Sequence, residues 1–472
     1  MLKSNIKIAK LFLLDRNVEG PRSRLRSHRI LILIITFIIY TIYHMSRKPM
    51  SVIKSKLYNG NATDPNNWAP FNDKLANSLL SVLDGVYWSA YAIGMLCNGF
   101  IAERSNLRLY LSISMTLCGL MCLISGLAFY LSIHSLTFFI VVQFLSGWFQ
   151  SSGWPAVLAV MGNWFGTTKK GFIFGIWSLH TSLGNMLGTA LAGVFVDFNW
   201  GLSYIVPGII CLICSLIIFF TLIPKPEEVD LTLESKILYE STRSNQNQSI
   251  EISLTKNKKA IKFFEAFTIS GVIEFSICLF FTKSVSYIFL NWLPKYISSH
   301  GNISSSKSAY ISLMFDIGGC FGSIISGLIT DIIGYGSISC FLFLCLSIPS
   351  LFLLANFSHL NLPINLTLQF LNGFFINGPS SLITTTVSAN LACQVTMKAA
   401  TATVSAIVDG TGSIGAAIGP SIVGPLRDYF DDWNAIFYIA MIGNFLAASS
   451  LVRIVLRDTK FLITNNSQLS EI

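Results

Sequence analysis

The amino-acid sequence is dominated by long apolar stretches, each about the length of a membrane-spanning helix. A helix needs about 20 predominantly apolar residues to cross the roughly 30 Å hydrocarbon core of a bilayer. Of the 472 residues, 52% are hydrophobic and 12% are charged, whereas a soluble domain carries roughly 25% charged residues. Twelve stretches meet the length requirement, at approximately residues 29–56, 77–101, 109–131, 136–163, 171–195, 202–223, 267–297, 306–329, 336–356, 362–391, 400–424 and 433–456. The sequence therefore predicts an all-α polytopic membrane protein with twelve transmembrane helices.

Landmark residues recur in the second half of the chain at a near-constant distance. The turn Gly99–Glu103 after the second span corresponds to Gly327–Asp331 after the eighth span, and Gly184 corresponds to Gly412, both at an offset of 228 residues. Such a parallel repeat is typical of transporters whose two halves surround a central site, so we predict two six-helix halves. The expected segments are a basic cytosolic N-terminus over 1–28, a first half over 29–223, a polar cytosolic linker over 224–266, a second half over 267–456 and a cytosolic tail over 457–472.

Positive charge is distributed unevenly between the two sides of the predicted membrane. The formal net charge of +9, taken alone, is compatible with a nucleic-acid partner. With cytosolic termini, however, 23 of the 32 Lys and Arg residues lie in inward-facing segments and six lie in outward-facing ones. This is the positive-inside pattern, so we expect the lipid bilayer and no nucleic acid as a partner. The same topology places Asn61, in the sequon Asn61-Ala62-Thr63, on the lumenal or extracellular side as a glycosylation site.

Two adjacent cations, Arg47 and Lys48, interrupt the first span. Each costs about 2.5–3.5 kcal/mol to insert at the centre of a membrane helix, so such residues usually face a cavity and bind something. On a helix, positions i, i+3, i+4 and i+7 share one face, and here that face is a polar aromatic stripe of Tyr40, Tyr43, His44 and Arg47. We therefore predict that Arg47 and Tyr43 bind an anion. The alternative is that both cations extend to the distant lipid headgroups.

If the halves are related, a counterpart of Arg47 should occur in the first span of the second half. Lys283 lies there, and Tyr287 and Asn291 follow on the same face at i+4 and i+8. An arginine offers a planar fork that matches two phosphate oxygens, whereas a lysine acts as a point charge. This pattern predicts that Lys283, Tyr287 and Asn291 join Arg47 in binding a phosphoryl group. A purely structural ion pair of Lys283 is the alternative.

Lys48 lies about 100° around the helix from Arg47, so the two cannot face one ligand squarely. We expect Lys48 to form a salt bridge in only one conformational state of the protein. Its candidate partners are acidic residues in two predicted spans, Asp316 in the eighth and Glu274 in the seventh.

Six stretches of the sequence resemble one family of transporters. They are TIYHMSRKPMSVIKSKL at 41–57, NWAPFND at 67–73, SGWFQSSGWPAVLAVMGNWFG at 146–166, GIWSLHTSLGNMLGTALAG at 175–193, GLSYIVPG at 201–208 and FTKSVSYIFLNWLPKYI at 281–297. Together with the repeat they resemble the major facilitator superfamily, specifically its organophosphate:phosphate antiporters, and most nearly the sugar-phosphate exchangers of the endoplasmic reticulum. The resemblance covers essentially the whole chain. It implies a substrate-binding role for His180, because antiporters of this family place a histidine at the matching position.

The resemblance implies a phosphate-linked antiporter that exchanges a sugar phosphate, such as glucose 6-phosphate, for inorganic phosphate by alternating access in the endoplasmic reticulum membrane. A monomer would suffice for this activity. A proton-coupled carrier of another small organic anion or sugar is one alternative. Such a carrier would need an acidic residue at the place where the first span has cations.

A membrane-embedded enzyme acting on phosphorylated substrates is the other alternative. It would need a nucleophile or a metal site. The sequence has no Gly-rich phosphate loop and no His/Asp/Glu cluster at ligand spacing, and all ten cysteines lie in predicted spans. We therefore expect no enzymatic activity, no metal and no cofactor.

Overall fold

The computed structural model describes residues 21–59, 61, 64–165, 177–229, 231, 263–301, 303–393 and 401–470. Over these residues the regular structure is helical, and they contain no β-strand. The predicted all-α class is thereby confirmed. Most of the predicted linker over 224–266 and the first 20 residues of the predicted N-terminal segment lie outside the described residues.

The described helices of the first half follow its six predicted spans. They are α2 (Pro21–Ser46) with α3 (Pro49–Leu57), α4 (Ala76–Arg104), α5 (Leu107–Tyr130), α6 (Leu136–Gln150) with α7 (Gly153–Phe165), α9 (His180–Phe195) and α10 (Trp200–Thr221). A short 3₁₀ helix, η1 (Pro226–Val229), follows α10. The first and fourth spans are each divided between two helices.

The described helices of the second half follow the other six spans. A short helix, α13 (Phe263–Ala266), precedes them. They are α14 (Val272–Gly301), α15 (Ser305–Ile333), α16 (Gly336–Phe357), α17 (Leu362–Leu382) with the π-helix η2 (Ile383–Val387) and α18 (Ser388–Cys393), α19 (Thr401–Phe430) and α20 (Asn434–Ser470). The tenth span is therefore the interrupted one in this half.

In the described part of the chain, nine helical segments are long and apolar enough to cross a membrane. The other three predicted spans contain α6 with α7, α9, and α17 with η2 and α18. Two of these are short as continuous helices, since α6 has 15 residues and α9 has 16. The helix positions are consistent with the twelve predicted spans.

The ends of the first and last helices differ from the predicted bounds. α2 begins at Pro21, before the predicted start at 29, and α20 continues to Ser470, past the predicted end at 456. Hydropathy detects only the part of a helix that lies in the apolar layer, whereas its backbone hydrogen bonds can continue into water. Both helices therefore extend beyond the stretches predicted to cross the membrane.

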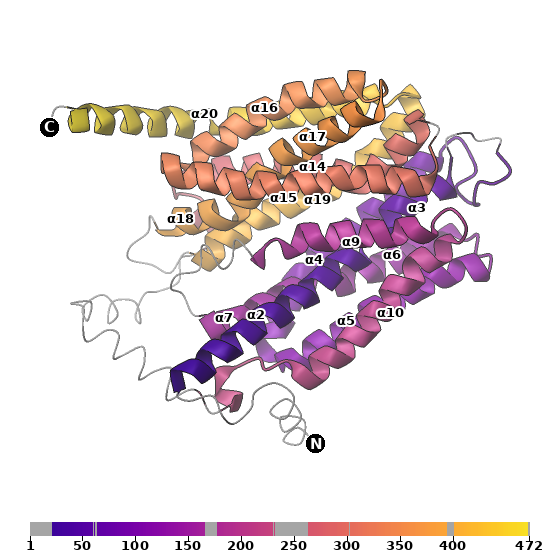
Figure 1. Cartoon of the computed structure of the whole chain (residues 1–472), viewed down its shortest axis with the longest axis horizontal. Helices are drawn as coiled ribbons and strands as arrows, with labels where there is room; N and C mark the ends of the chain where they lie inside the picture. The colour runs from indigo at the N-terminus through magenta and orange to yellow at the C-terminus, as the bar shows by residue number, and fades with distance from the viewer. Residues whose placement is uncertain are drawn as a thin grey trace.

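The two halves form separate groups of helices that lie side by side (Figure 1). The indigo-to-magenta helices of the first half occupy the lower part of the view, and the orange-to-yellow helices of the second half occupy the upper part. α2 begins and α20 ends on the same side of the bundle, while α3 lies at the opposite end. The predicted two-half architecture is confirmed.

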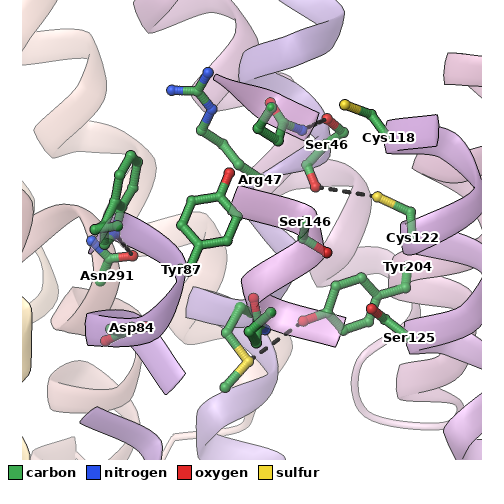
Figure 2. A pocket seen from close by; sticks show the side chains of 14 residues that line it. Ser46, Arg47, Asp84, Tyr87, Cys118, Cys122, Ser125, Ser146, Tyr204 and Asn291 are labelled. Carbon is green, nitrogen blue, oxygen red and sulfur yellow. Dashed lines mark hydrogen bonds between the residues drawn. The ribbon is translucent and has the colours of Figure 1, made fainter. Parts of the chain in front are cut away.

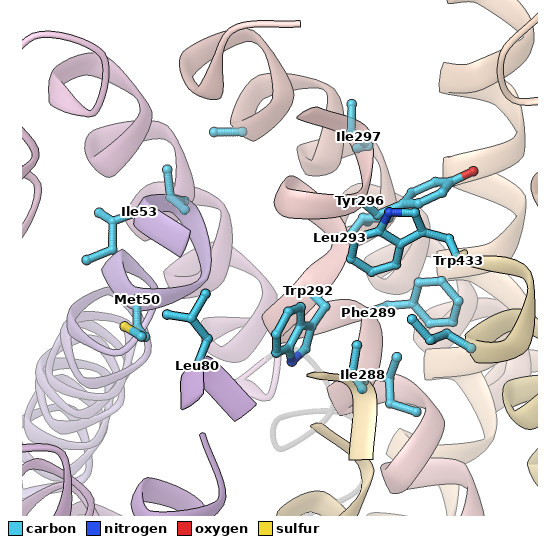
Figure 3. Packing of buried hydrophobic residues seen from close by; sticks show 14 of the residues in the cluster. Met50, Ile53, Leu80, Ile288, Phe289, Trp292, Leu293, Tyr296, Ile297 and Trp433 are labelled. Atoms are coloured by element: carbon cyan, nitrogen blue, oxygen red, sulfur yellow. The ribbon is translucent and has the colours of Figure 1, made fainter. Parts of the chain in front are cut away.

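One hydrophobic cluster joins the two halves at the end where α3 lies. Met50 and Ile53 of α3 and Leu80 of α4 face Trp292 of α14 across the interface (Figure 3). All four side chains are buried. Removing this apolar surface from water or lipid headgroups favours close packing of the halves at this end.

Polar contacts bridge the halves in the same region. Ser55 Oγ of α3 lies 2.9 Å from Ser305 Oγ of α15. Asp428 of α19 accepts hydrogen bonds from Asn77 Nδ2 at 2.8 Å and from the Ser78 amide at 2.7 Å, both at the start of α4. The structure therefore describes a state in which the halves are closed at this end.

We expect the double substitution Ser55→Cys with Ser305→Cys to form a disulfide under mild oxidation, because the two side-chain oxygens are within hydrogen-bond distance. A protease site engineered into the 224–266 linker would then give two fragments that separate on an electrophoresis gel only after reduction. The pair Ser55→Cys with Ser339→Cys is the control, because Ser339 lies near the start of α16, which follows the opposite end of α15 from Ser305. Fragments that separate without reductant in the first pair would contradict the described interface.

Candidate functional site

The first span is broken at Arg47 and Lys48, between α2 and α3. Pro49 has no N–H, so the Met45 carbonyl cannot accept a bond from it and instead accepts the Lys48 N–H at 3.3 Å. α3 then resumes with Pro49 at its first position, where a missing N–H costs nothing. The two cations therefore sit at a helix break inside the span.

Arg47 is surrounded by aromatic rings and has unused hydrogen-bond donors. Its guanidinium carbon lies 5.3 Å from the ring centre of Tyr91 and 5.9 Å from that of Trp88, both on α4. Nε and Nη2 are buried and have no hydrogen-bond partner among the described residues. A cation–π contact is worth about 0.5–2 kcal/mol, which offsets only part of the cost of burying a charge. The guanidinium therefore keeps two buried donors that a ligand could use.

Arg47 borders a small cavity that extends into the first half (Figure 2). The space open to water is about 30 Å³, which holds about two molecules at roughly 10–15 Å³ each. Its walls come from α2 to α6, α10 and α14. Asn291 of α14 is the second-half residue in this lining, so Arg47 and Asn291 meet at one cavity from opposite halves.

Tyr287 and Asn291 lie one turn apart on α14 and both reach Trp88 of the first half. The Tyr287 and Trp88 rings are 4.6 Å apart between centroids in an edge-to-face arrangement. Trp88 Nε1 donates to Asn291 Oδ1 at 3.5 Å, while Asn291 Nδ2 donates to the Tyr287 carbonyl at 2.8 Å. Since Trp88 also contacts Arg47, one indole links the predicted residues of both halves.

Lys283 is paired within its own half. Its Nζ lies 2.6 Å from Asp409 Oδ1 of α19. Gly412 provides the room, because a Cβ there would lie 2.9 Å from Lys283 Cδ. The ion pair that the sequence analysis left open as the alternative is therefore present in this state, formed with a carboxylate distant in sequence.

His180 lies in an aromatic box between α2 and α9. Its ring contacts Tyr40 and Trp177 edge to face, with centroid distances of 4.6 Å and 4.4 Å. Nδ1 lies 3.1 Å from Thr181 Oγ1, and the buried Nε2 has no hydrogen-bond partner among the described residues. His180 is not in the lining of the cavity beside Arg47.

Tyr43 packs away from that cavity, against α7. A Cβ added to Gly153 would lie 2.9 Å from the Tyr43 ring, so the glycine is what allows the ring to sit there. Tyr43 is fully buried in the core of the first half, and its hydroxyl has no partner among the described residues. The α2 stripe therefore splits, with Tyr43 and Arg47 facing different neighbours.

Lys48 crosses to the second half. Its Nζ donates to the Leu290 carbonyl at 3.1 Å and lies 3.9 Å from Asp316 Oδ2. The Leu290 carbonyl is available because Pro294, four residues on, has no N–H to donate to it.

Glu274, the other predicted partner of Lys48, pairs instead with Arg453 of α20 at 2.6 Å. Glu274 lies in the first turn of α14, whereas Leu290 and Asp316 hold Lys48 further along the helices. The prediction that Glu274 could pair with Lys48 is therefore wrong for this structure.

Lys54 and Lys295, expected in outward-facing segments, are buried between the halves. Lys54 Nζ lies 2.5 Å from Asp84 and donates to the Asn291 carbonyl at 3.1 Å. Lys295 Nζ donates to the Tyr58 carbonyl at 2.5 Å, just beyond the end of α3. The free carbonyls at a helix C-terminus favour a cation. The sequence analysis counted both lysines among the six basic residues of outward-facing segments, because only packing reveals their partners.

The aromatic residues of α4 are the main site residues that the sequence analysis missed. Tyr87, Trp88 and Tyr91 lie beside Arg47 or in its cavity. Their spacing of i, i+1 and i+4, directly after the intramembrane Asp84, was the available signal. Within the described residues, no three His, Cys, Asp or Glu side chains are grouped to hold a metal ion. Asn61 is exposed in the loop between α3 and α4.

The fold and the site define a polytopic membrane protein built from two helical halves that meet around a buried arginine. The family model for the Major Facilitator Superfamily matches residues 27–408 and 275–471. The chain belongs to this superfamily.

The chain is also similar to individual proteins along most of its length. It is 42% identical over 466 residues to the glucose-6-phosphate exchanger SLC37A2 of Bos taurus, which covers 91% of this chain and 94% of that protein. It is 38% identical over 473 residues to the putative glycerol-3-phosphate transporter 5 of Arabidopsis thaliana, which covers 95% of each.

Solved structures share the fold at low sequence identity. A bacterial homologue of the human lysosomal transporter Spinster, in an inward-facing and unoccupied conformation, has a TM-score of 0.63 and 14% identity, covering 94% of this chain and 98% of that one. The D-xylose-proton symporter has a TM-score of 0.61 and 12% identity, covering 89% and 96%.

Proposed function

We propose that this protein exchanges a sugar phosphate for inorganic phosphate across a membrane by alternating access. The observation that carries the proposal is Arg47, a buried guanidinium with free donors at a cavity between the halves. Relatives named as a glucose-6-phosphate exchanger and a glycerol-3-phosphate transporter support a phosphorylated polyol as substrate. Transport without chemical conversion of the substrate accords with membership of this superfamily.

In this proposal Arg47 is the principal phosphoryl ligand. Its fork donates two parallel hydrogen bonds to phosphate oxygens, which an ammonium cannot do. Lys283 contributes a second charge once the phosphoryl group competes with Asp409 for its Nζ. Tyr287 and Asn291 face the phosphate from the second half. Because ligands then come from both halves, binding favours their closure around the substrate.

His180 and Tyr43 complete the proposed set of substrate ligands. Both carry a buried polar atom without a partner among the described residues, His180 Nε2 and Tyr43 Oη. A reorientation of α2 against α7 and α9 would bring them toward Arg47, since α2 packs on α7 at Gly153 and on α9 at Gly184. A neutral imidazole can donate to a phosphate oxygen, and a phenol can do the same.

Obligatory exchange follows from the same charges. An empty cavity leaves Arg47 without an anionic partner, so closing both ends around it costs the desolvation of a bare charge. A bound phosphate neutralises that charge and lowers the cost. The cycle then proceeds only with either phosphate or sugar phosphate bound, and one protein molecule is enough for it.

Substitution of Arg47 tests this role directly. We expect Arg47→Lys to lower phosphate exchange in proteoliposomes by about 100-fold or more, because two charge-assisted hydrogen bonds of about 1.5–3 kcal/mol each are lost. Lys283→Arg should retain more activity, because its contribution is chiefly charge. Arg47→Ala with Lys283→Ala should be little worse than either single change, since residues that act as a unit are non-additive.

Lys307→Ala is the control for loss of a cation, because Lys307 is exposed at the start of α15. Matched reconstitution and thermal stability separate transport defects from misfolding. Near-normal exchange by Arg47→Ala would remove the observation on which the proposed function depends.

Lys48 is proposed to act on the conformational change. In the described state, with the halves closed at the α3 end, it bonds the Leu290 carbonyl and lies 3.9 Å from Asp316. We propose that both contacts break when this end opens. We expect Lys48→Ala and Asp316→Asn to change the maximal exchange rate by about threefold or more, while the apparent affinity for phosphate stays within about twofold. Glu274→Gln is the control, because Glu274 pairs with Arg453. If Lys48→Ala abolished phosphate binding at an unchanged rate, Lys48 would belong to the substrate site.

We further propose that both termini and the 224–266 linker face the cytosol, that Asn61 is glycosylated in the lumen, and that the membrane is that of the endoplasmic reticulum. The basic asymmetry of the sequence supports this orientation. In sealed microsomes, external protease should cut the linker, and Asn61→Gln should remove one glycan. Cleavage of the linker only after the vesicles are permeabilised would indicate the opposite topology.

A further inference from the structure

The cavity beside Arg47 contains a second unpaired group, the side-chain carbonyl of Gln150. Gln150 is the last residue of α6 and is 3% exposed. Its Nε2 donates to Ser46 Oγ at 2.6 Å, while its buried Oε1 has no hydrogen-bond partner among the described residues. Both Gln150 and Ser46 line the cavity. A buried acceptor without a donor costs about 1–3 kcal/mol, so its presence calls for a partner.

The hydrogen bonds around Ser46 determine which end of the amide is free. The Ser46 hydroxyl has one proton, and it donates that proton to the Tyr43 carbonyl at 3.0 Å. Ser46 Oγ can therefore only accept from Gln150, which requires the amide nitrogen to face Ser46. The carbonyl oxygen of Gln150 is then the group left for a donor.

Tyr87 adds a second unpaired group to the same cavity. Its hydroxyl is buried and has no hydrogen-bond partner among the described residues. Figure 2 shows Arg47 and Tyr87 on one side of the cavity and Cys118 and Cys122 on the other. Gly147, one turn before Gln150, packs directly on the Tyr87 backbone carbonyl, where any Cβ would collide. The contact of α4 with α6 at this glycine brings both unpaired groups to one cavity.

The chemistry of these groups fits an alcohol. A phosphate monoester has a second pKa of about 6, so above neutral pH its phosphoryl oxygens only accept hydrogen bonds. These oxygens can accept from the Arg47 guanidinium, but they cannot donate to Gln150 Oε1. A hydroxyl on the carbon chain of the substrate can donate to Gln150 Oε1 and accept from Tyr87. In this closed state the cavity has room for about two water molecules, which matches the size of a hydroxyl group.

We propose that this cavity binds a hydroxyl of the organic phosphate, with Gln150 and Tyr87 as its hydrogen-bond partners, while the phosphoryl group binds Arg47. The inference rests on the proposed function and makes it more specific. The substrate class is then a phosphate monoester that carries a free hydroxyl close to the phosphoryl group. Phosphate esters with bare alkyl chains are discriminated against, because they leave both protein groups unpaired.

The experiment compares glycerol 3-phosphate with n-propyl phosphate, which has the same carbon chain without hydroxyls. Each ester competes with labelled phosphate for phosphate:phosphate exchange in proteoliposomes at pH 8. We expect the unmodified protein to prefer glycerol 3-phosphate by about tenfold or more, as sites built to bond a hydroxyl do. In Gln150→Met the preference should fall to about threefold or less, with inhibition by n-propyl phosphate retained.

Two further variants complete the test. Tyr87→Phe should also reduce the preference, and it keeps the ring if Gln150→Met fails to fold. Gln369→Met is the matched control, because Gln369 is a fully buried glutamine of α17 in the other half and does not line this cavity. It should leave the preference at about tenfold or more.

The outcomes separate this inference from the proposed function. Equal inhibition by both esters in the unmodified protein, or an equal loss of both in Gln150→Met, would overturn the hydroxyl site. Absence of phosphate exchange, or of any inhibition by either ester, would instead overturn the proposed exchange function.

Discussion

The cost of burying a cation in a low-dielectric layer organises this structure. Five basic residues near the interface between the halves lie in candidate membrane spans: Arg47, Lys48, Lys54, Lys283 and Lys295. In the described residues each lysine has a carboxylate or a backbone carbonyl as partner. Arg47 has only aromatic rings. Since an unpaired buried charge is destabilising, the single exception is where a ligand is expected.

Lys48, Lys54 and Lys295 also connect the two halves, because each donates to a backbone carbonyl of the opposite half. Pro294 leaves the Leu290 carbonyl free for Lys48, and the end of α3 leaves the Tyr58 carbonyl free for Lys295. A bond from an ammonium to a carbonyl places one charge at the interface instead of two. Separating the halves then requires only that the lysines find other acceptors, such as water, which suits an interface that must open in each cycle.

The site itself depends on contact between distant helices. Trp88 contacts Arg47 in its own half and both Tyr287 and Asn291 in the other half. A movement of one half relative to the other therefore changes the surroundings of Trp88. Glycines at the helix contacts allow this close packing. Gly147 brings α6 onto α4, and Gly412 gives the Lys283 side chain its space beside Asp409. In the proposed function, substrate recognition and closure of the halves therefore use the same contacts.

The sequence by itself determined the class of fold, the places of the spans and the position of Arg47 within the first span, because the cost of placing polar groups in a bilayer is a local property of each segment. Its internal repeat also indicated two related halves. Only the tertiary structure decided that Asp409, 126 residues away, neutralises Lys283 and that Lys54 and Lys295 are buried. It also brought α4 to the site. Which buried charges pair, and which stay free, depends on how helices far apart in the chain pack against one another.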